Sequence, residues 1–268
     1  MKEGAKCSPG TVSKILWHFT GGPKWDDQKK ERVEKPAAEA FKALCSIVKD
    51  RELRLGEYTE IVRTEYEEIA SRPVCCLADI PIVHLGYHGN SYGSFAIGFH
   101  RSAAIRNGFN PVFYSPASAE AAGSICHPLY SLQVVNPDDI TNKAREIAAL
   151  VRGIVGQISE TDVLRELKTI EDEAVKIATF VNEARESLFQ FVAHVKTFEE
   201  DQFGTVYCER EWRALRSFNF SYQDVAMIVL PRVIGGERYF EDFITKVVPS
   251  IELPRSIPIV PWEDLVEH

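Results

Sequence analysis

A histidine and a threonine close the first apolar stretch of the chain, Lys14 to Thr20 (KILWHFT). The stretch is typical of a β-strand, in which residues two apart point to one face, so His18 and Thr20 are expected side by side. A neutral imidazole and a hydroxyl on one face can hold a ribose or a carboxamide, and the Gly21-Gly22 turn leaves backbone open to a ligand. The structural alternative is a core histidine satisfied by a backbone carbonyl.

A second polar group lies late in the chain, where Glu209, Glu211 and Arg213 alternate along a predicted strand and are expected on one face. Two carboxylates buried together are costly without a ligand or a cation, whereas an exposed strand edge accommodates them easily. If this group does chemistry, Glu211 is the first candidate for the catalytic carboxylate and Glu209 the second. Arg213 is then a salt-bridge partner or a phosphate ligand.

Aromatic and histidine residues in the middle of the chain offer weaker signals. Tyr92 precedes Gly93 at the start of a predicted strand and can stack on a flat ring, although packing in the core explains it equally well. His84 and His88 have the i, i+4 spacing of two metal ligands, but no third ligand follows at a telling spacing, so no metal site is predicted. Phosphate loops, nucleophile elbows and dinucleotide fingerprints are missing from the sequence.

The elements that must position these residues alternate between strands and helices in the first half of the chain. A helix is predicted from Pro36, because the apolar residues after it recur at i, i+3 and i+4. Short strands are predicted at Val74 to Leu77, Ser94 to Phe99 and Pro111 to Tyr114.

From Pro137 to about Val195 the sequence is helical, with a break near Gly153 and Gly156 and an N-terminal cap predicted at Ser159. Apolar residues step by three or four through the second helix, which predicts an amphipathic helix packed antiparallel to the first. These residues are Val163, Leu167, Ile170, Ala174, Ile177, Val181, Ala184, Leu188 and Phe191. The pair is either a structural hairpin or a partner-binding arm.

Strand patterns return after Gly204. Strands are predicted at Val206 to Phe218, Ala226 to Leu230 and Ile257 to Val260, with a helix from Gly236 to Val247. The sequence therefore predicts an α+β fold with a mixed or antiparallel central sheet and a long helical hairpin insertion. Residues 1–135 and 199–268 form the two halves of one α/β domain, and residues 136–198 form the insertion.

Composition sets limits on the class of protein. The 268 residues are 45% hydrophobic and 26% charged, as in an ordinary globular protein, so disorder is not expected. The net charge of -8 excludes a general attraction to nucleic acid or to an anionic membrane. A signal peptide and a membrane-spanning run are both missing, and the six cysteines lack CxxC pairs. We expect a cytoplasmic protein with free thiols, no membrane association and an oligomeric state that the sequence leaves open.

Four blocks of the sequence occur in an order that resembles the AbiGi family of abortive phage-resistance proteins. They are Leu16-Trp17-His18-Phe19-Thr20, Cys76-Leu77-Ala78-Asp79-Ile80-Pro81 with Tyr92-Gly93-Ser94-Phe95-Ala96-Ile97-Gly98-Phe99, Gly108-Phe109-Asn110-Pro111-Val112-Phe113-Tyr114, and Glu209-Arg210-Glu211-Trp212-Arg213. The resemblance implies a role in antiviral defence by abortive infection, with an operon partner that completes a toxin–antitoxin pair. AbiGi proteins are commonly regarded as the antitoxin.

The order of the blocks also resembles a diverged ADP-ribosyltransferase fold. That resemblance implies a transferase in which His18, Thr20, Tyr92 and Arg213 bind NAD while Glu211, assisted by His18 and Glu209, is catalytic. NAD is then a consumed co-substrate, no cofactor is bound tightly, and the acceptor is a nucleic acid or a protein. The alternatives are a non-catalytic antitoxin that neutralises its partner by binding, and a domain that senses a phage component. The transferase requires His18, Tyr92 and Glu211 to converge in one pocket.

Overall fold

The structure is a computed structural model that describes residues 13–26, 31–65, 68–155 and 161–266. The described residues fall into two compact units. The first is drawn from Met1–Tyr58, Pro73–Phe113 and Glu200–His268, and the second from Thr59–Arg72 and Tyr114–Glu199. The expected insertion, residues 136–198, falls within the range of the second unit.

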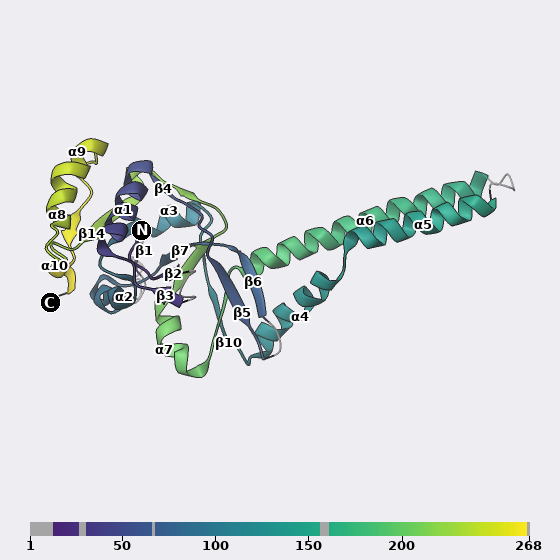
Figure 1. The fold of residues 1–268 in the computed structure, drawn as a ribbon, viewed down its shortest axis with the longest axis horizontal. Coiled ribbons are helices and arrows are strands. Elements are labelled where there is room, and N and C mark those ends of the chain that lie inside the picture. The colour runs from purple at the N-terminus through teal and green to yellow at the C-terminus, as the bar shows by residue number, and fades with distance from the viewer. Residues whose placement is uncertain (1–12, 27–30, 66–67, 156–160, 267–268) are drawn as a thin grey trace, which may run out of the picture. The chain divides into compact units, whose positions relative to one another are not determined.

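A seven-stranded sheet forms the centre of the first unit (Figure 1). Its strands follow the order β15 (Ile259–Pro261), β14 (Val225–Leu230), β8 (Ala96–His100), β1 (Ile15–Phe19), β7 (Cys75–Ala78), β12 (Glu211–Ala214) and β9 (Asn110–Pro111). The β14–β15 pair is parallel and the other pairs are antiparallel. The prediction of an α+β fold with a mixed sheet is confirmed.

Alternation along the strands gives this sheet two apolar faces. Helix α1 (Ala37–Asp50) covers one of them, the α1 face, by packing Ala40, Leu44 and Val48 against strand residues such as Leu16. The other face, the Trp17 face, surrounds the Trp17 indole, whose Nε1 donates to the Ile80 carbonyl at 3.0 Å. Neighbouring residues of one strand therefore belong to different cores.

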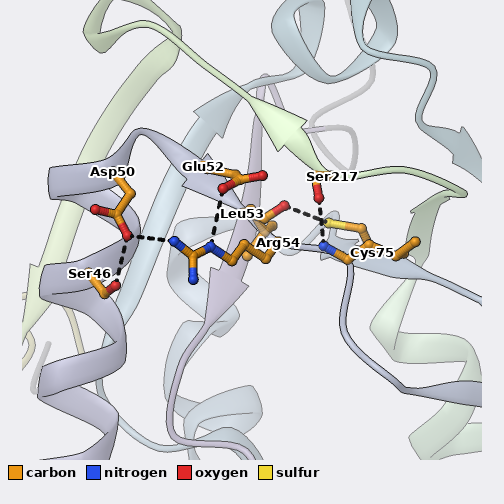
Figure 2. A network of polar contacts seen from close by, with 8 residues as sticks. Ser46, Asp50, Glu52, Leu53, Arg54, Cys75 and Ser217 are labelled. Carbon is orange, nitrogen blue, oxygen red and sulfur yellow. Dashed lines mark hydrogen bonds and ion pairs between the residues drawn. The ribbon is translucent and has the colours of Figure 1, made fainter.

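Helix α1 begins directly after Pro36, as predicted, because proline suits the start of a helix and its missing N–H is not needed there. The helix ends at Arg51, which has left-handed backbone angles. A polar network follows it (Figure 2): Asp50 accepts from Ser46 at 3.1 Å and from Arg54 at 3.2 Å. The Cys75 thiol lies 3.8 Å from the Leu53 carbonyl oxygen, so β7 is joined to the short strand β4 (Glu52–Leu53).

Shorter elements complete the first unit. The strands are β2 (Lys24–Asp26) paired with β3 (Glu31–Val33), and β4 paired with β13 (Phe218–Asn219). The helices are α2 (Leu85–Tyr92), α3 (Arg101–Arg106), α7 (Phe203–Val206), α8 (Tyr239–Asp242), α9 (Val248–Ile251) and α10 (Glu263–Val266), with a π-helical turn at Phe243–Val247 and 3₁₀ turns at Ile82–His84, Glu200–Gln202, Tyr207–Glu209 and Tyr222–Asp224.

The second unit combines two small β-pairs with three helices. Its strands are β5 (Thr59–Arg63) paired with β6 (Glu68–Pro73), and β10 (Phe113–Pro116) paired with β11 (Val195–Phe198); its helices are α4 (Glu120–Val134), α5 (Pro137–Val155) and α6 (Thr161–Val192). Figure 1 shows α5 and α6 lying side by side, and Arg152 pairs with Glu171 across them at 2.8 Å. The two predicted helices are confirmed, whereas the predicted cap at Ser159 lies outside the described residues.

Three predicted elements differ from the structure. The strand expected at Pro111 to Tyr114 is divided between β9 and β10, which belong to different sheets. The strand expected from Val206 begins only at Glu211, because a 3₁₀ turn and the left-handed Arg210 (φ 39°) precede it. The helix expected from Gly236 begins at Tyr239 and continues through a π-helical turn to Ile251. Within the described part of the chain, no helix has both the length and the apolar character that crossing a membrane requires.

Candidate functional site

Glu211 and Arg213 lie at the start of β12 and form a buried ion pair, with Arg213 Nη2 2.7 Å from Glu211 Oε2. Glu211 is 8% exposed and Arg213 0%. In the strand register Glu211 is opposite Ala78 and Arg213 is opposite Cys76, while Trp17 is opposite Ala78. Both charged side chains therefore belong to the Trp17 face, and each compensates the burial of the other.

Cys76 of β7 is the neighbour that this pair contacts across the ladder. The thiol hydrogen-bonds the Glu211 carboxylate, and burial together with the negative charge of Glu211 raises the pKa of Cys76 well above its usual value. The thiol is thus held protonated, so it is a hydrogen-bond donor and a poor nucleophile. The sequence gave no signal that Cys76 contacts Glu211.

His18 approaches the same cysteine through the backbone. Its Nδ1 lies 3.2 Å from the Cys76 carbonyl oxygen. Desolvation lowers the pKa of His18 to about 4; the bond to Cys76 opposes this shift, and the charge of Lys35 adds to it. His18 follows Trp17 along β1, so its side chain points to the α1 face. Glu211 belongs to the Trp17 face, so the two side chains point to opposite faces of the sheet.

Thr20 faces α1, two residues after His18 as expected. Its Oγ1 donates to the Ala40 carbonyl at 2.8 Å, and its own carbonyl accepts from Lys35 Nζ at 2.7 Å. The side chain is 3% exposed, so the hydroxyl serves to join the end of β1 to the first turns of α1.

Tyr92 is the last residue of α2 and contacts Glu209 there, so the expectation that Tyr92 lies at the start of a strand is wrong. The Tyr92 hydroxyl donates to Glu209 Oε1 at 2.7 Å, and the tyrosine ring stacks on His88 with 4.3 Å between ring centroids. Phe19 of the Trp17 face packs against both rings. Glu209 belongs to the 3₁₀ turn before β12, so the expectation that it shares a strand face with Glu211 is wrong.

Arg210 separates the two glutamates and anchors the turn. Its Nε and Nη2 donate to the Asp79 carbonyl at 2.8 and 2.6 Å, and the Asp79 N–H donates to the Arg210 carbonyl at 3.1 Å. Burial raises the pKa of the Asp79 carboxyl, and the nearby Arg210 charge opposes the shift. No sequence signal marks Arg210 for a left-handed conformation, which favours glycine or asparagine.

A pocket of about 660 Å³ opens elsewhere in the first unit, between the Gly21 turn, the start of α1 and the segment around Gly93. Gly93 has φ 78°, and a Cβ on it would lie 3.2 Å from the Gly21 Cα, so the walls of the pocket meet through bare backbone. Among the residues that line it, Lys35 and Glu34 carry charge.

The predicted site residues divide into two groups, and one residue of each, His18 and Glu211, contacts Cys76. His18 and Thr20 lie on the α1 face, while Tyr92, Glu209, Glu211 and Arg213 gather beside the Trp17 face. None of the six lines the pocket. For a metal, no group of three or more His, Cys, Asp or Glu side chains is suitably placed among the residues that the structure describes.

Comparison of the sequence with known proteins identifies the family of this chain. The chain matches no curated protein and no solved structure. The model of one protein family matches residues 56–243, well over half of the chain and part of both compact units. That family is described as abortive phage resistance protein AbiGi, antitoxin. The chain belongs to the AbiGi family.

Proposed function

We propose that this protein is the antitoxin of an abortive phage-defence pair and that it neutralises a toxin from the same operon by binding it in the cytoplasm. The family match over residues 56–243 carries the proposal, because the family description names both phage resistance and the antitoxin role. An antitoxin of this kind needs a stable fold and a binding surface, and it needs no catalytic centre.

The surroundings of the predicted carboxylates support a binding role. Glu211 neutralises a fully buried arginine and accepts from a protonated thiol, so its charge already has partners within the fold. The hydroxyls of Thr20 and Tyr92 likewise donate hydrogen bonds within the fold, to the Ala40 carbonyl and to the Glu209 carboxylate. These contacts hold β1, β7, β12, α1 and α2 together, which is what a rigid binding protein requires.

Growth of a bacterial host tests the proposal. The neighbouring gene of the operon is expressed alone, and then together with this chain or with an empty vector. We expect the neighbour alone to stop growth, this chain alone to be harmless, and co-expression to restore growth. A neighbour that stays toxic despite soluble, abundant antitoxin would contradict the proposal.

An NAD-consuming ADP-ribosyltransferase is the second candidate function, and one observation favours it. Cys76 touches His18 through its carbonyl and Glu211 through its thiol, so the two predicted catalytic residues approach one residue of β7. In such an enzyme Glu211 would stabilise the positive charge that develops on the nicotinamide ribose. The acceptor would be a nucleic acid or a protein.

Expression of this chain alone separates the two functions. The transferase predicts toxicity and a fall in cellular NAD, both lost in Glu211→Gln at a matched soluble level. Matching the level matters because Glu211 also neutralises Arg213. Unchanged growth and NAD with the wild-type chain alone would count against the transferase.

A further inference from the structure

Helix α6 buries one apolar stripe and leaves further apolar side chains exposed beside it. One set of apolar residues recurs every seven residues at Leu167 and Ala174, which are 6% and 7% exposed. Ala178, which is 7% exposed, extends the same buried stripe, whereas Ile170 and Ile177 are 50% and 53% exposed. Ile170 and Ile177 therefore lie beside the buried stripe of α6, where a further helix can reach them.

Helix α5 adds apolar residues beside this uncovered set. Ile147 is 50% exposed and Leu150 is 70% exposed. The ion pair between Arg152 and Glu171 fixes the level at which the antiparallel helices meet, so Leu150 lies near Ile170 along the hairpin axis. The two helices thus contribute apolar side chains at matching heights.

The turn of about 100° per residue in an α-helix decides on which side of the hairpin each side chain lies. Measured from the seam of buried residues, the same side receives five exposed apolar residues, which we call the hairpin face: Ile147, Leu150, Ile170, Ile177 and Phe180. Arg152, Glu171 and the exposed Leu164 and Val175 fall on the opposite side. The ion pair between Arg152 and Glu171 agrees with this assignment, because both partners must share a side.

Exposed apolar side chains that gather on one side of a helical hairpin are typical of an interaction site. Two rows of side chains along neighbouring helices match the shape of a third helix, which would insert its own apolar residues at i, i+3, i+4 and i+7. A third helix would also cover Ile170 and Ile177, which α5 leaves exposed.

Charge identifies the kind of helix. Glu166 and Glu173 precede Phe180 at seven-residue intervals, so their exposed carboxylates lie in one row with its ring. On α5 the ammonium group of Lys143 is already paired with Glu146 at 3.3 Å. The border is acidic, as is the whole chain with its net charge of -8. A helix with flanking lysines or arginines complements this border, whereas a second copy of the chain would set acidic borders against each other.

We propose that the hairpin face binds a basic amphipathic helix of the operon toxin. The inference rests on the proposed antitoxin function and adds the surface and the chemistry of its partner.

The test measures the affinity of the purified full-length chain for the protein encoded by the neighbouring gene. Ile177→Glu and Phe180→Glu are expected to weaken binding by about tenfold or more, because each places a charge in the apolar contact. Glu166→Lys with Glu173→Lys should weaken it as well, and the wild-type affinity should fall as salt rises. Val175→Glu, an exposed apolar residue of the same helix on the opposite side, is the matched control and should bind like the wild type.

The outcomes separate this inference from the proposed function. Suppose that Ile177→Glu, Phe180→Glu and Val175→Glu all neutralise the toxin and bind it with equal affinity. This result would overturn the assignment of the hairpin face as the binding site and leave the antitoxin function standing. A wild-type chain that neither binds nor neutralises the neighbour would overturn both. A dimer of the wild type that Ile177→Glu dissociates and Val175→Glu does not would assign the face to a second copy. Circular dichroism of each variant confirms that the helices are intact, which the exposure of these side chains leads us to expect.

Discussion

Glu211 and Arg213, two residues apart on one strand, neutralise each other inside the Trp17 face at 2.7 Å. Neither charge is compensated by bulk water, since the arginine side chain is fully buried and the carboxylate nearly so. Breaking such a pair leaves a buried charge behind and is far more damaging than removing both partners together.

Glu211→Gln is therefore expected to lower the free energy of unfolding by about 3–5 kcal/mol. The double variant Glu211→Gln, Arg213→Met should lose less free energy of unfolding than Glu211→Gln, because it also removes the buried charge of Arg213. Urea denaturation at neutral pH measures both. Equal stabilities of the wild type and Glu211→Gln would show that the ion pair contributes little.

His18 predicts a pH dependence of stability. Its pKa is about 4 in the folded chain and 6.5 ordinarily, so between these values the unfolded chain binds the proton and the folded chain does not. The neutral form of His18 therefore contributes to the free energy of unfolding. This contribution is complete above pH 6.5 and is lost as the pH falls through 4, and it amounts to roughly 3 kcal/mol at most for a shift of this size. Comparison of the wild type with His18→Gln across this window isolates the effect. Parallel curves would contradict it.

Gly89 lies inside α2, where alanine ordinarily stabilises a helix by about 0.5–1 kcal/mol. A Cβ at this position would overlap the ring of Trp262, so Gly89→Ala is expected to lower the melting temperature and to alter tryptophan fluorescence. Gly153 of α5 has nothing within 4 Å of its Cβ position, which makes Gly153→Ala the control. That variant should be neutral or stabilising, and a similar loss in both would refute the packing argument.

The cysteines predict an order of alkylation. Among those that the structure describes, Cys208 is exposed, whereas burial raises the pKa of Cys75 to about 12 and that of Cys76 well above its usual value. Iodoacetamide should therefore label Cys208 first and reach Cys75 and Cys76 only on unfolding, since the thiolate is the reactive form. Peptide mass spectrometry with and without urea measures this. Rapid native labelling of Cys76 would contradict its protected position.

Local patterns predicted the elements of this fold better than the contacts between them. The apolar spacing after Pro36 and along α6 sufficed to place both helices, because helix periodicity is a local property. The separation of His18 from Glu211 onto different faces depends on the pairing of β1, β7 and β12, which no local pattern specifies.

The turn before β12 shows the same limit on a smaller scale. Alternation of Glu209 and Glu211 predicts one strand face, and only the left-handed Arg210 breaks it. That conformation is secured by hydrogen bonds to Asp79, a residue 131 positions away, so it could not be read from the neighbouring residues.

The order of the strands along the chain has a consequence for synthesis on the ribosome. Strands β8, β1 and β7 precede the segment Tyr114–Glu199, while β12 and β14, which flank them in the sheet, follow it. Helices with local contacts form quickly, and nascent chains fold from their N-terminal side. A chain released early, after α6, would thus present a finished hairpin beside a three-stranded fragment with both edges open. Such fragments pair readily with one another, so premature termination is expected to yield aggregates instead of a smaller folded protein.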